Sequence, residues 1–252
     1  MLDIRNVMFG NAFRTFATLL AMWCILLVFF YLQPGIDIAV AHSFFNEVVC
    51  AAGTANAQVC GHFPYSSQEL FKILREVLFY LPAAIAVALL GLMLKSLGKQ
   101  AAADVRRVRE YGIAIISMLI GPYVLVNLVL KELSDRPRPA DTTLFGGRMP
   151  FAPAGDFGGA CISNCSFVSG EAAGAGWLAC LVVLLPAHLR TVLGPPLIVI
   201  ALIAPALRLS FGRHYLSDVT LGFLSSLVVY AAVTALFEMT QSVKKTPSAP
   251  GL

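Results

Sequence analysis

Six long apolar runs dominate the pattern of this chain. They cover about 15–32, 77–94, 111–130, 170–187, 191–207 and 219–237. A helix needs about 20 mainly apolar residues to cross the hydrocarbon core of a bilayer, so each run is long enough or nearly so. No polar stretch between them is long enough for a separate domain. We therefore predict that residues 1–252 form one all-α domain, a membrane bundle of six transmembrane helices.

The composition excludes the soluble and disordered classes of protein. Hydrophobic residues make up 58% of the chain and charged residues 13%, against about 45–50% and about 25% in soluble domains. A soluble globule of this size could not keep so much apolar side chain from water. The net charge of +4 is the difference between 18 Lys and Arg and 14 Asp and Glu. The basic residues form no run, so a nucleic-acid partner is not indicated.

The distribution of basic residues predicts the orientation in the membrane. Ten of the 18 lie near one set of span ends, which includes both termini and the 95–110 loop. They are Arg5, Arg14, Lys95, Lys99, Arg106, Arg107, Arg109, Arg190, Lys244 and Lys245. By the positive-inside rule this face is cytoplasmic. The two long loops, about 33–76 and 131–169, then lie on the exported face, and we expect a bacterial inner membrane with that face toward the periplasm.

Four cysteines fall in the two exported loops. The pairing that we favour is Cys50 with Cys60 and Cys161 with Cys165, because disulfides persist in oxidising compartments. A zinc site is the alternative, although neither pair has the C-x-x-C spacing.

A helix is expected to begin near Ser66, because Ser66 and Glu69 have the spacing of a capping box. Two interpretations of this helix stay open. It either lies at the membrane surface before the second span or simply extends that span.

Charged and polar residues gather at the exported ends of spans three to six. Lys131 and Arg138 are separated by six residues, and Arg208 follows at the end of the fifth span. Three cations at three helix ends suit the oxygens of a phosphoryl group, and Arg offers planar two-pronged donors. Ser169 and Gly170 begin the fourth span, where free backbone N–H groups can face an anion.

His214 and Asp218 are four residues apart and therefore share one helix face. The carboxylate can then hold the imidazole in one tautomer, which is the arrangement of an activated nucleophile.

These motifs resemble those of the type-2 phosphatidic acid phosphatase superfamily. Lys131, Arg138 and Pro139 match its first motif, Ser169 and Gly170 its second, and Arg208, His214 and Asp218 its third. The resemblance implies a six-span, metal-independent lipid phosphatase without a cofactor. By it, His214 attacks phosphorus and forms a phosphohistidine, Asp218 orients His214, and the cations bind the phosphoryl oxygens with the Ser169 and Gly170 amides. The residue sequence from Cys165 to Glu171 is similar to that of lipid A phosphatase-like members.

The chain departs from the motifs at three positions. Val168 stands for the usual Pro, Glu171 for the usual His that protonates the leaving oxygen, and Leu207 for the usual Ser. Either Glu171 is the general acid, which requires burial to raise its pKa, or the leaving group is good enough to need no acid. The second interpretation favours an anomeric phosphate of lipid A or undecaprenyl diphosphate. Phosphatidylglycerol phosphate and phosphatidic acid are further candidate substrates.

Two other functions use the same residues. A lipid-to-lipid phosphotransferase would pass the phosphoryl group from His214 to a second lipid, and a non-catalytic protein would bind a lipid phosphate without turnover. Three arginines outside the motifs, Arg136, Arg148 and Arg213, are expected to be headgroup or loop contacts. Asn127, inside the third span, is expected to hydrogen-bond a neighbouring helix. The sequence gives no indication of an oligomeric state.

Overall fold

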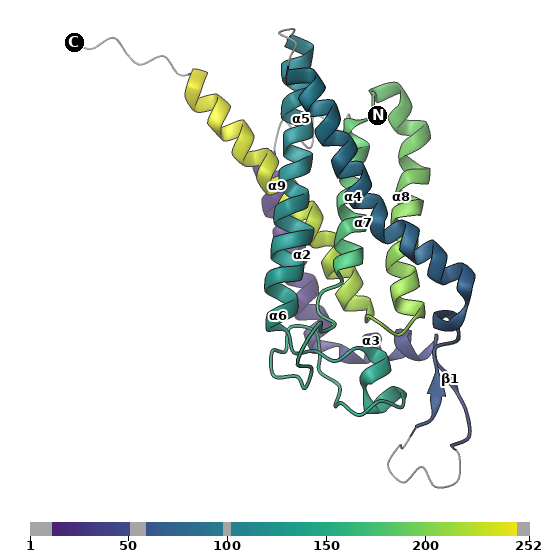
Figure 1. Ribbon diagram of the computed structural model, residues 1–252. Helices are drawn as coiled ribbons and strands as arrows, with labels where there is room; N and C mark the ends of the chain where they lie inside the picture. Colours follow the sequence, from purple (N-terminus) through teal and green to yellow (C-terminus); the bar gives the residue numbers. More distant parts are fainter. Residues whose placement is uncertain (1–11, 51–58, 98–101, 246–252) are drawn as a thin grey trace, which may run out of the picture.

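The computed structural model describes residues 12–50, 59–97 and 102–245, and it is almost entirely helical (Figure 1). Its long helices are α2 (Ala12–Leu32), α4 (Glu69–Leu97), α5 (Ala102–Met118), α7 (Gly170–Cys180), α8 (Ala187–Ser210) and α9 (Leu216–Lys245). α5 continues through the π-helical segment η2 (Leu119–Leu130) into α6 (Lys131–Leu133), and α7 ends in the short segment η5 (Leu181–Leu184). This confirms the predicted all-α class.

Five of these helices are long and apolar enough to cross a membrane, at Ala12–Leu32, Glu69–Leu97, Asp104–Leu133, Ala187–Ser210 and Leu216–Thr240. The sixth predicted span is the shorter apolar helix Gly170–Leu184. The chain is therefore a multi-pass membrane protein. Arg5 and Lys99, two residues used to predict its orientation, lie outside the described residues.

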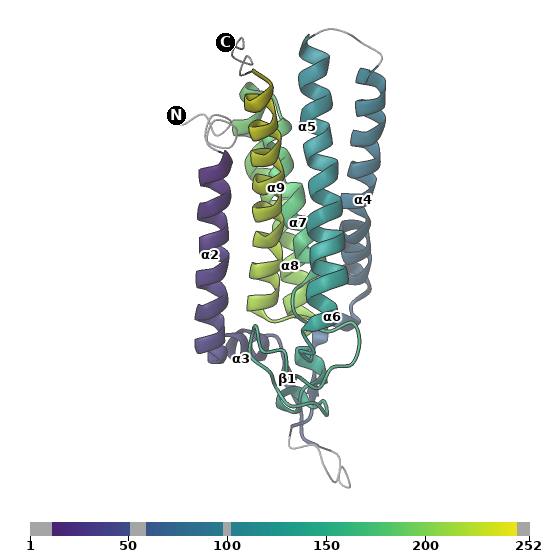
Figure 2. The ribbon, with the colours of Figure 1, turned by 90° about the vertical axis from the view of Figure 1, so that its left-hand side faces the viewer.

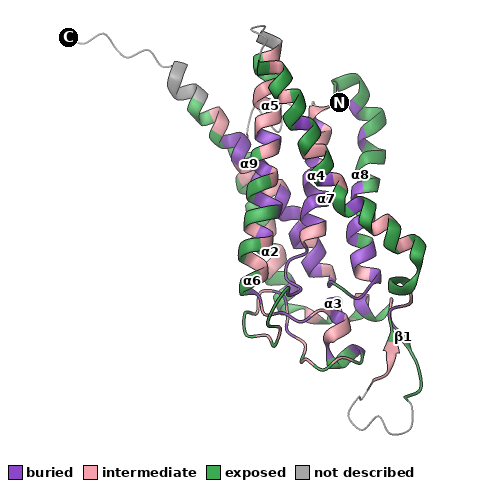
Figure 3. Cartoon of the chain, in the orientation of Figure 1, coloured by how far each residue is buried: buried purple, intermediate pink, exposed green. Residues whose placement is uncertain are grey.

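α7 lies at the centre of the bundle and packs against α9, α8, η2 and α4 (Figure 3). Most of its residues are buried, whereas α2 and α4 expose many apolar side chains. Small residues let the neighbouring helices approach, and a Cβ at Gly176 would collide with the backbone of Phe223 on α9. Trp177 donates its indole N–H to the carbonyl of Ala114 at 2.8 Å, which ties α7 to α5.

The long connections gather at one end of the bundle, where α3 (Pro34–His42), the hairpin of β1 (Asn46–Glu47) and β2 (Gly61–His62), and α6 lie (Figure 2). The short helical turns η1 (Pro64–Ser67), η3 (Pro139–Asp141) and η4 (Thr143–Phe145) belong to these connections. Phe45, Phe63 and Phe145 form an aromatic cluster with ring centroids 5.2–5.7 Å apart. Both predicted disulfides, Cys50–Cys60 and Cys161–Cys165, are present. The four cysteines are therefore not available as zinc ligands.

α4 begins close to the predicted place but without the predicted cap. The Ser66 hydroxyl donates to the carbonyl of Phe63 within η1, and α4 starts only at Glu69 after an extended Gln68. The prediction of a capping box between Ser66 and Glu69 was therefore wrong. α4 then runs without interruption to Leu97, so the segment is an extension of the second span.

Candidate active site

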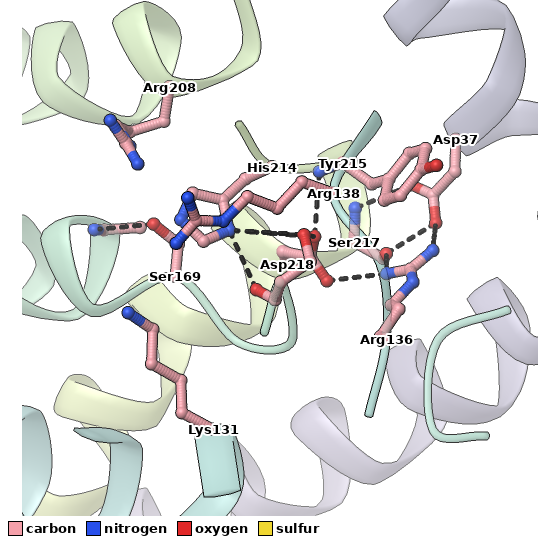
Figure 4. A network of polar contacts seen from close by, with 12 residues as sticks. Asp37, Lys131, Arg136, Arg138, Ser169, Arg208, His214, Tyr215, Ser217 and Asp218 are labelled. Carbon is pink, nitrogen blue, oxygen red and sulfur yellow. Dashed lines mark hydrogen bonds and ion pairs between the residues drawn. The ribbon is translucent and has the colours of Figure 1, made fainter. Parts of the chain in front are cut away.

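Residues from all three sequence motifs line one cavity, at the end of the bundle where the connections gather. The cavity has a volume of about 1220 Å³, and Lys131, Arg138, Glu171, Arg208 and His214 line it together. They come from α6, the loop after it, the start of α7, the end of α8 and the α8–α9 connection. In Figure 4, Lys131, Arg138 and Arg208 surround His214. Sequence positions up to 83 residues apart thus form one site because α6, α7 and α8 all end or begin at this level.

His214 is almost completely buried, and its tautomer is fixed by Ser166. Its Nδ1 lies 2.8 Å from the backbone carbonyl oxygen of Ser166, which can only accept, so Nδ1 bears the proton. The lone pair of Nε2 is then free to act as a nucleophile. The nearer oxygen of Asp218 lies 3.8 Å from Nδ1. The Ser166 carbonyl is thus the closer acceptor for Nδ1, and the orienting role of Asp218 stays a prediction.

The environment of His214 keeps its imidazole neutral. Burial lowers its pKa to about 4, while Asp218 opposes the shift and the positive charge of Arg208 adds to it. A neutral imidazole is the form that can attack phosphorus. Asp218 contacts His214 indirectly as well, because Ser166 donates its hydroxyl to Asp218 at 2.5 Å.

Arg136 is part of this network, which corrects its assignment as a headgroup or loop contact. Its side chain is 0% exposed and its guanidinium donates to Asp218 at 2.6 Å and to Asp37 at 2.8 Å. Nε donates to the carbonyl of Ala152 at 2.9 Å, and the group lies 4.3 Å from the ring centroid of Tyr215. Each of its three nitrogens therefore donates to a group of the protein, and Figure 4 shows the contacts with Asp37 and Asp218.

Asp37, on α3, was not predicted as a site residue. It accepts from the backbone N–H of Ser217 at 2.8 Å and from the Ser217 hydroxyl at 2.5 Å. Burial raises its pKa, and Arg136 opposes that shift. One signal was available in the sequence, because Asp37 is the only charged residue between Arg14 and Glu47. A lone acid in an apolar segment has a structural or chemical reason to be there.

Asn164 holds two of the predicted phosphate-binding cations. Lys131 donates to its side-chain oxygen at 3.1 Å and Arg138 to its backbone oxygen at 2.8 Å. Asn164 has φ +49°, a left-handed conformation that asparagine tolerates. Among the described residues, the buried Nε of Arg138 has no hydrogen-bond acceptor. The Nε of Arg208 has none either, but Oε1 of Glu171 lies 3.4 Å from it. The N–H of Arg138 is therefore available for an oxyanion.

Ser169 has a different role from the predicted one. Its hydroxyl caps α7 by accepting from the Ala172 N–H at 3.3 Å, and its own N–H donates to the carbonyl of Asp218 at 3.0 Å. The amide of Ser169 is therefore engaged, whereas Gly170 and Glu171 line the cavity.

Gly170 lies against Asn127, and a Cβ there would be 2.5 Å from the Asn127 side-chain oxygen. Asn127 donates to the carbonyl of Pro122 in its own helix at 2.7 Å. The expectation that it bonds to a neighbouring helix was therefore wrong. The contact nevertheless places the start of α7 directly against η2.

Glu171 lies between two guanidinium groups. The Nε of Arg75, on α4, is 3.1 Å from both of its oxygens, and Nη2 of Arg75 is 2.5 Å from Oε1. Arg208 Nε is 3.4 Å from the same Oε1. Arg75 belongs to none of the three sequence motifs. It lies 96 residues from Glu171 in the chain, and no sequence pattern predicted their contact. The described residues include no group of three or more His, Cys, Asp or Glu that could hold a metal ion.

Comparison with known proteins places this geometry in a family. The PAP2 superfamily model matches residues 110–242, which contain all three motifs. Two similar proteins are named lipid A 4′-phosphatase: one from Rhizobium etli, 46% identical over 94% of this chain and 92% of its own, and one from Rhizobium leguminosarum, 47% identical over 89% and 97%. A protein of the same name from Francisella tularensis subsp. novicida is 28% identical over 81% of this chain and 89% of its own. No solved structure matches the chain.

Proposed function

Because this chain belongs to the PAP2 superfamily, we propose that it is a membrane phosphatase that removes the 4′-phosphate of lipid A through a phosphohistidine at His214. The observation that supports this most directly is the buried His214, whose Nδ1–H is held by Ser166 in the cavity that Lys131, Arg138 and Arg208 line. The names of the relatives support lipid A as the substrate.

In the proposed reaction the Nε2 lone pair of His214 attacks phosphorus, and the bond from phosphorus to the sugar oxygen breaks. The Ser166 carbonyl accepts the Nδ1–H throughout, and the imidazole becomes positive as the new N–P bond forms. Lys131, Arg138 and Arg208 stabilise the charge on the remaining phosphoryl oxygens. Water then attacks the phosphohistidine, releases inorganic phosphate and restores the neutral imidazole.

The leaving group determines what Glu171 does. A 4′-hydroxyl is an ordinary sugar alcohol rather than an anomeric oxygen, so its departure needs a proton. We assign this proton to Glu171, which lines the cavity beside Arg208. Arg75 and Arg208 both contact its carboxylate, which places that group at the phosphate-binding cations.

The walls of the cavity match a lipid with a large headgroup. One side is apolar and lies between α4 and η2, where Phe79, Pro82, Pro122 and Tyr123 line it. The charged groups Lys131, Arg138, Glu171 and Arg208 line the same cavity. Acyl chains on the apolar side would place the headgroup phosphate at His214. We place this end of the bundle at the periplasmic face of a bacterial inner membrane, with both termini cytoplasmic, since the disulfides lie at the same end.

The test is release of inorganic phosphate by the full chain in detergent from lipid A, undecaprenyl diphosphate, phosphatidylglycerol phosphate and phosphatidic acid. His214→Ala should abolish release, and His188→Ala, which changes an exposed histidine at the start of α8 away from the cavity, should not. Release from lipid A alone or fastest, with phosphate labelling of His214, is the expected result. Label that moves to a second lipid would identify a phosphotransferase, and no label on His214 would identify a binding protein.

A further inference from the structure

We propose that Asp37 and Arg136 are positioning residues for His214, which act on it through Asp218. This inference rests on the proposed histidine chemistry but concerns residues outside the three motifs. Arg136 joins the carboxylates of Asp37 and Asp218 with the two arms of one guanidinium, at 2.8 and 2.6 Å (Figure 4). The side chains of all three residues are 0% exposed. The catalytic histidine is thus connected to the first exported loop, far from it in the sequence.

The geometry of the fork fixes where Asp218 can lie. Nη1 of Arg136 binds Oδ1 of Asp218, while the Ser166 hydroxyl and the Tyr215 N–H bind Oδ2. With both oxygens occupied, the carboxylate cannot rotate toward or away from His214. A guanidinium has a rigid planar fork, which lysine lacks, so the two contacts depend on arginine.

Asp37 fixes the other end of the network on the backbone of α9. Its Oδ1 accepts from the N–H of Ser217, in the first turn of α9, where backbone N–H groups have no partner within the helix. Its Oδ2 accepts from the Ser217 hydroxyl and from Arg136. α9 begins at Leu216, two residues after His214, so Asp37 holds the segment that contains both His214 and Asp218.

The charges of the network also favour the reaction. His214 faces the cations Lys131 on α6 and Arg208 on α8, which oppose positive charge on its ring, and the anion Asp218 on α9, which favours it. Arg136 partly cancels Asp218, and Asp37 cancels Arg136 in turn. The buried trio therefore has a net negative charge beside a ring that becomes positive during the reaction. Loss of the Asp37 charge makes the net charge of the three side chains zero, and the positively charged phosphohistidine is then less stable.

The experiment is a double-mutant cycle between Asp37→Asn and Asp218→Asn in the purified full chain. We expect Asp37→Asn to lower kcat for lipid A about tenfold with KM changed less than about twofold. The double variant should be no slower than Asp218→Asn alone, because Asp37 acts through Asp218. Losses that multiply in the double variant would overturn the proposal. Glu47→Gln, at an exposed acid of the same end of the bundle, is the matched control.

Three further variants keep the test decisive if Asp37→Asn does not fold. Ser217→Ala keeps every charge and removes the hydroxyl that contacts both Asp37 and Arg136. We expect it to lower kcat about threefold at an unchanged KM. Arg136→Lys should recover folding better than Arg136→Met but should not restore kcat, because lysine cannot bridge both carboxylates. Unchanged kcat in Ser217→Ala and Arg136→Lys would overturn the positioning role.

A measurement without substrate separates this inference from the proposed function. In ¹⁵N spectra of histidine-labelled protein, His214 should show a single tautomer protonated at Nδ1, because the Ser166 carbonyl accepts a hydrogen bond from that group. Asp37→Asn should keep this tautomer but shift the ring ¹⁵N resonances of His214, since Asp218 is no longer held in place. Unshifted resonances in that variant would contradict the positioning role even if the wild type releases phosphate. Shifted resonances in a protein that hydrolyses no lipid would support the positioning role and reject the phosphatase.

Discussion

The backbone carbonyl of Ser166 holds His214, at 2.8 Å from Nδ1, more closely than any carboxylate does. A carbonyl oxygen accepts a hydrogen bond but is too weak a base to remove the proton. The contact therefore sets the tautomer and leaves the proton on Nδ1. Asp218 then acts at 3.8 Å as a charge and, through the hydroxyl of Ser166, as a hydrogen-bond partner. Orientation and charge compensation of the proposed nucleophile are thus divided between two residues from different parts of the chain.

The buried His214 should make the stability of the protein depend on pH. Burial lowers its pKa from 6.5 to about 4, so between these values the unfolded state binds a proton that the folded state does not. The stability from the neutral imidazole is full above pH 6.5 and is lost as the pH falls toward 4, in total about 3 kcal/mol. Chemical unfolding of the wild type and of His214→Gln at pH 7 and pH 4.5 measures this. The wild type should lose more stability than the variant, and equal losses would contradict a buried neutral His214.

Glu171→Gln tests the proton donor. We expect kcat for lipid A to fall about 100-fold, because general acid catalysis contributes about 10²–10⁴-fold, while KM changes little. Glu76→Gln is the matched control, since Glu76 lines the same cavity from α4 and has no role in the proposed reaction. A substrate with a better leaving group, such as an aryl phosphate, should lose less activity in Glu171→Gln. Equal losses for both substrates would remove Glu171 from the protonation step.

Gly170→Ala should destabilise the protein by about 1–3 kcal/mol. The new Cβ would lie 2.5 Å from the side-chain oxygen of Asn127, which cannot withdraw without losing its 2.7 Å bond to Pro122. Gly91→Ala is the matched control, because it lies in α4 with nothing within 4 Å of the new Cβ. That substitution should be neutral or stabilise the helix by about 0.5–1 kcal/mol. Thermal unfolding in detergent measures both, and a stable Gly170→Ala protein would show that α7 and η2 are less closely packed.

Asn164→Gly should raise KM with little change in kcat. Glycine keeps the left-handed backbone at φ +49° and the carbonyl that binds Arg138, so only the contact with Lys131 is removed. One hydrogen bond of about 1 kcal/mol corresponds to about a fivefold change in KM. Steady-state kinetics with lipid A measure it. A fall in kcat at constant KM would mean that Asn164 acts in the transition state rather than in holding Lys131.

The two disulfides should differ in their effect on activity. The Cys161–Cys165 loop contains Asn164 and is followed at once by Ser166, so it supports both the cations and His214. Replacing both of its cysteines by serine should lower kcat/KM at least about tenfold. The same change at Cys50 and Cys60, in the β1–β2 hairpin, should leave kcat/KM within about twofold. Phosphate release from lipid A by the two double variants measures this, and equal effects would contradict the supporting role of the 161–165 loop.

The sequence by itself determined the membrane class, the helices and the residues that gather at the cavity. Hydrophobic length is a local property, so each predicted span lies within or next to a helix. Motif spacing is local as well, and Lys131, Arg138, Arg208 and His214 all line one cavity as predicted. The small differences lie at helix starts, where Ser66 bonds within its own turn instead of capping α4.

Only the tertiary structure decided which side chains contact Arg136, Glu171 and His214. Asp37 and Arg136 meet 99 residues apart, and Arg75 and Glu171 meet 96 residues apart, because four separate segments end at the same level of the bundle. Side-chain pairing over such distances depends on how helices are placed against one another, and no local pattern specifies that placement. The same reason explains why the structure, and not the spacing of His214 and Asp218, revealed Ser166 as the group that fixes the imidazole.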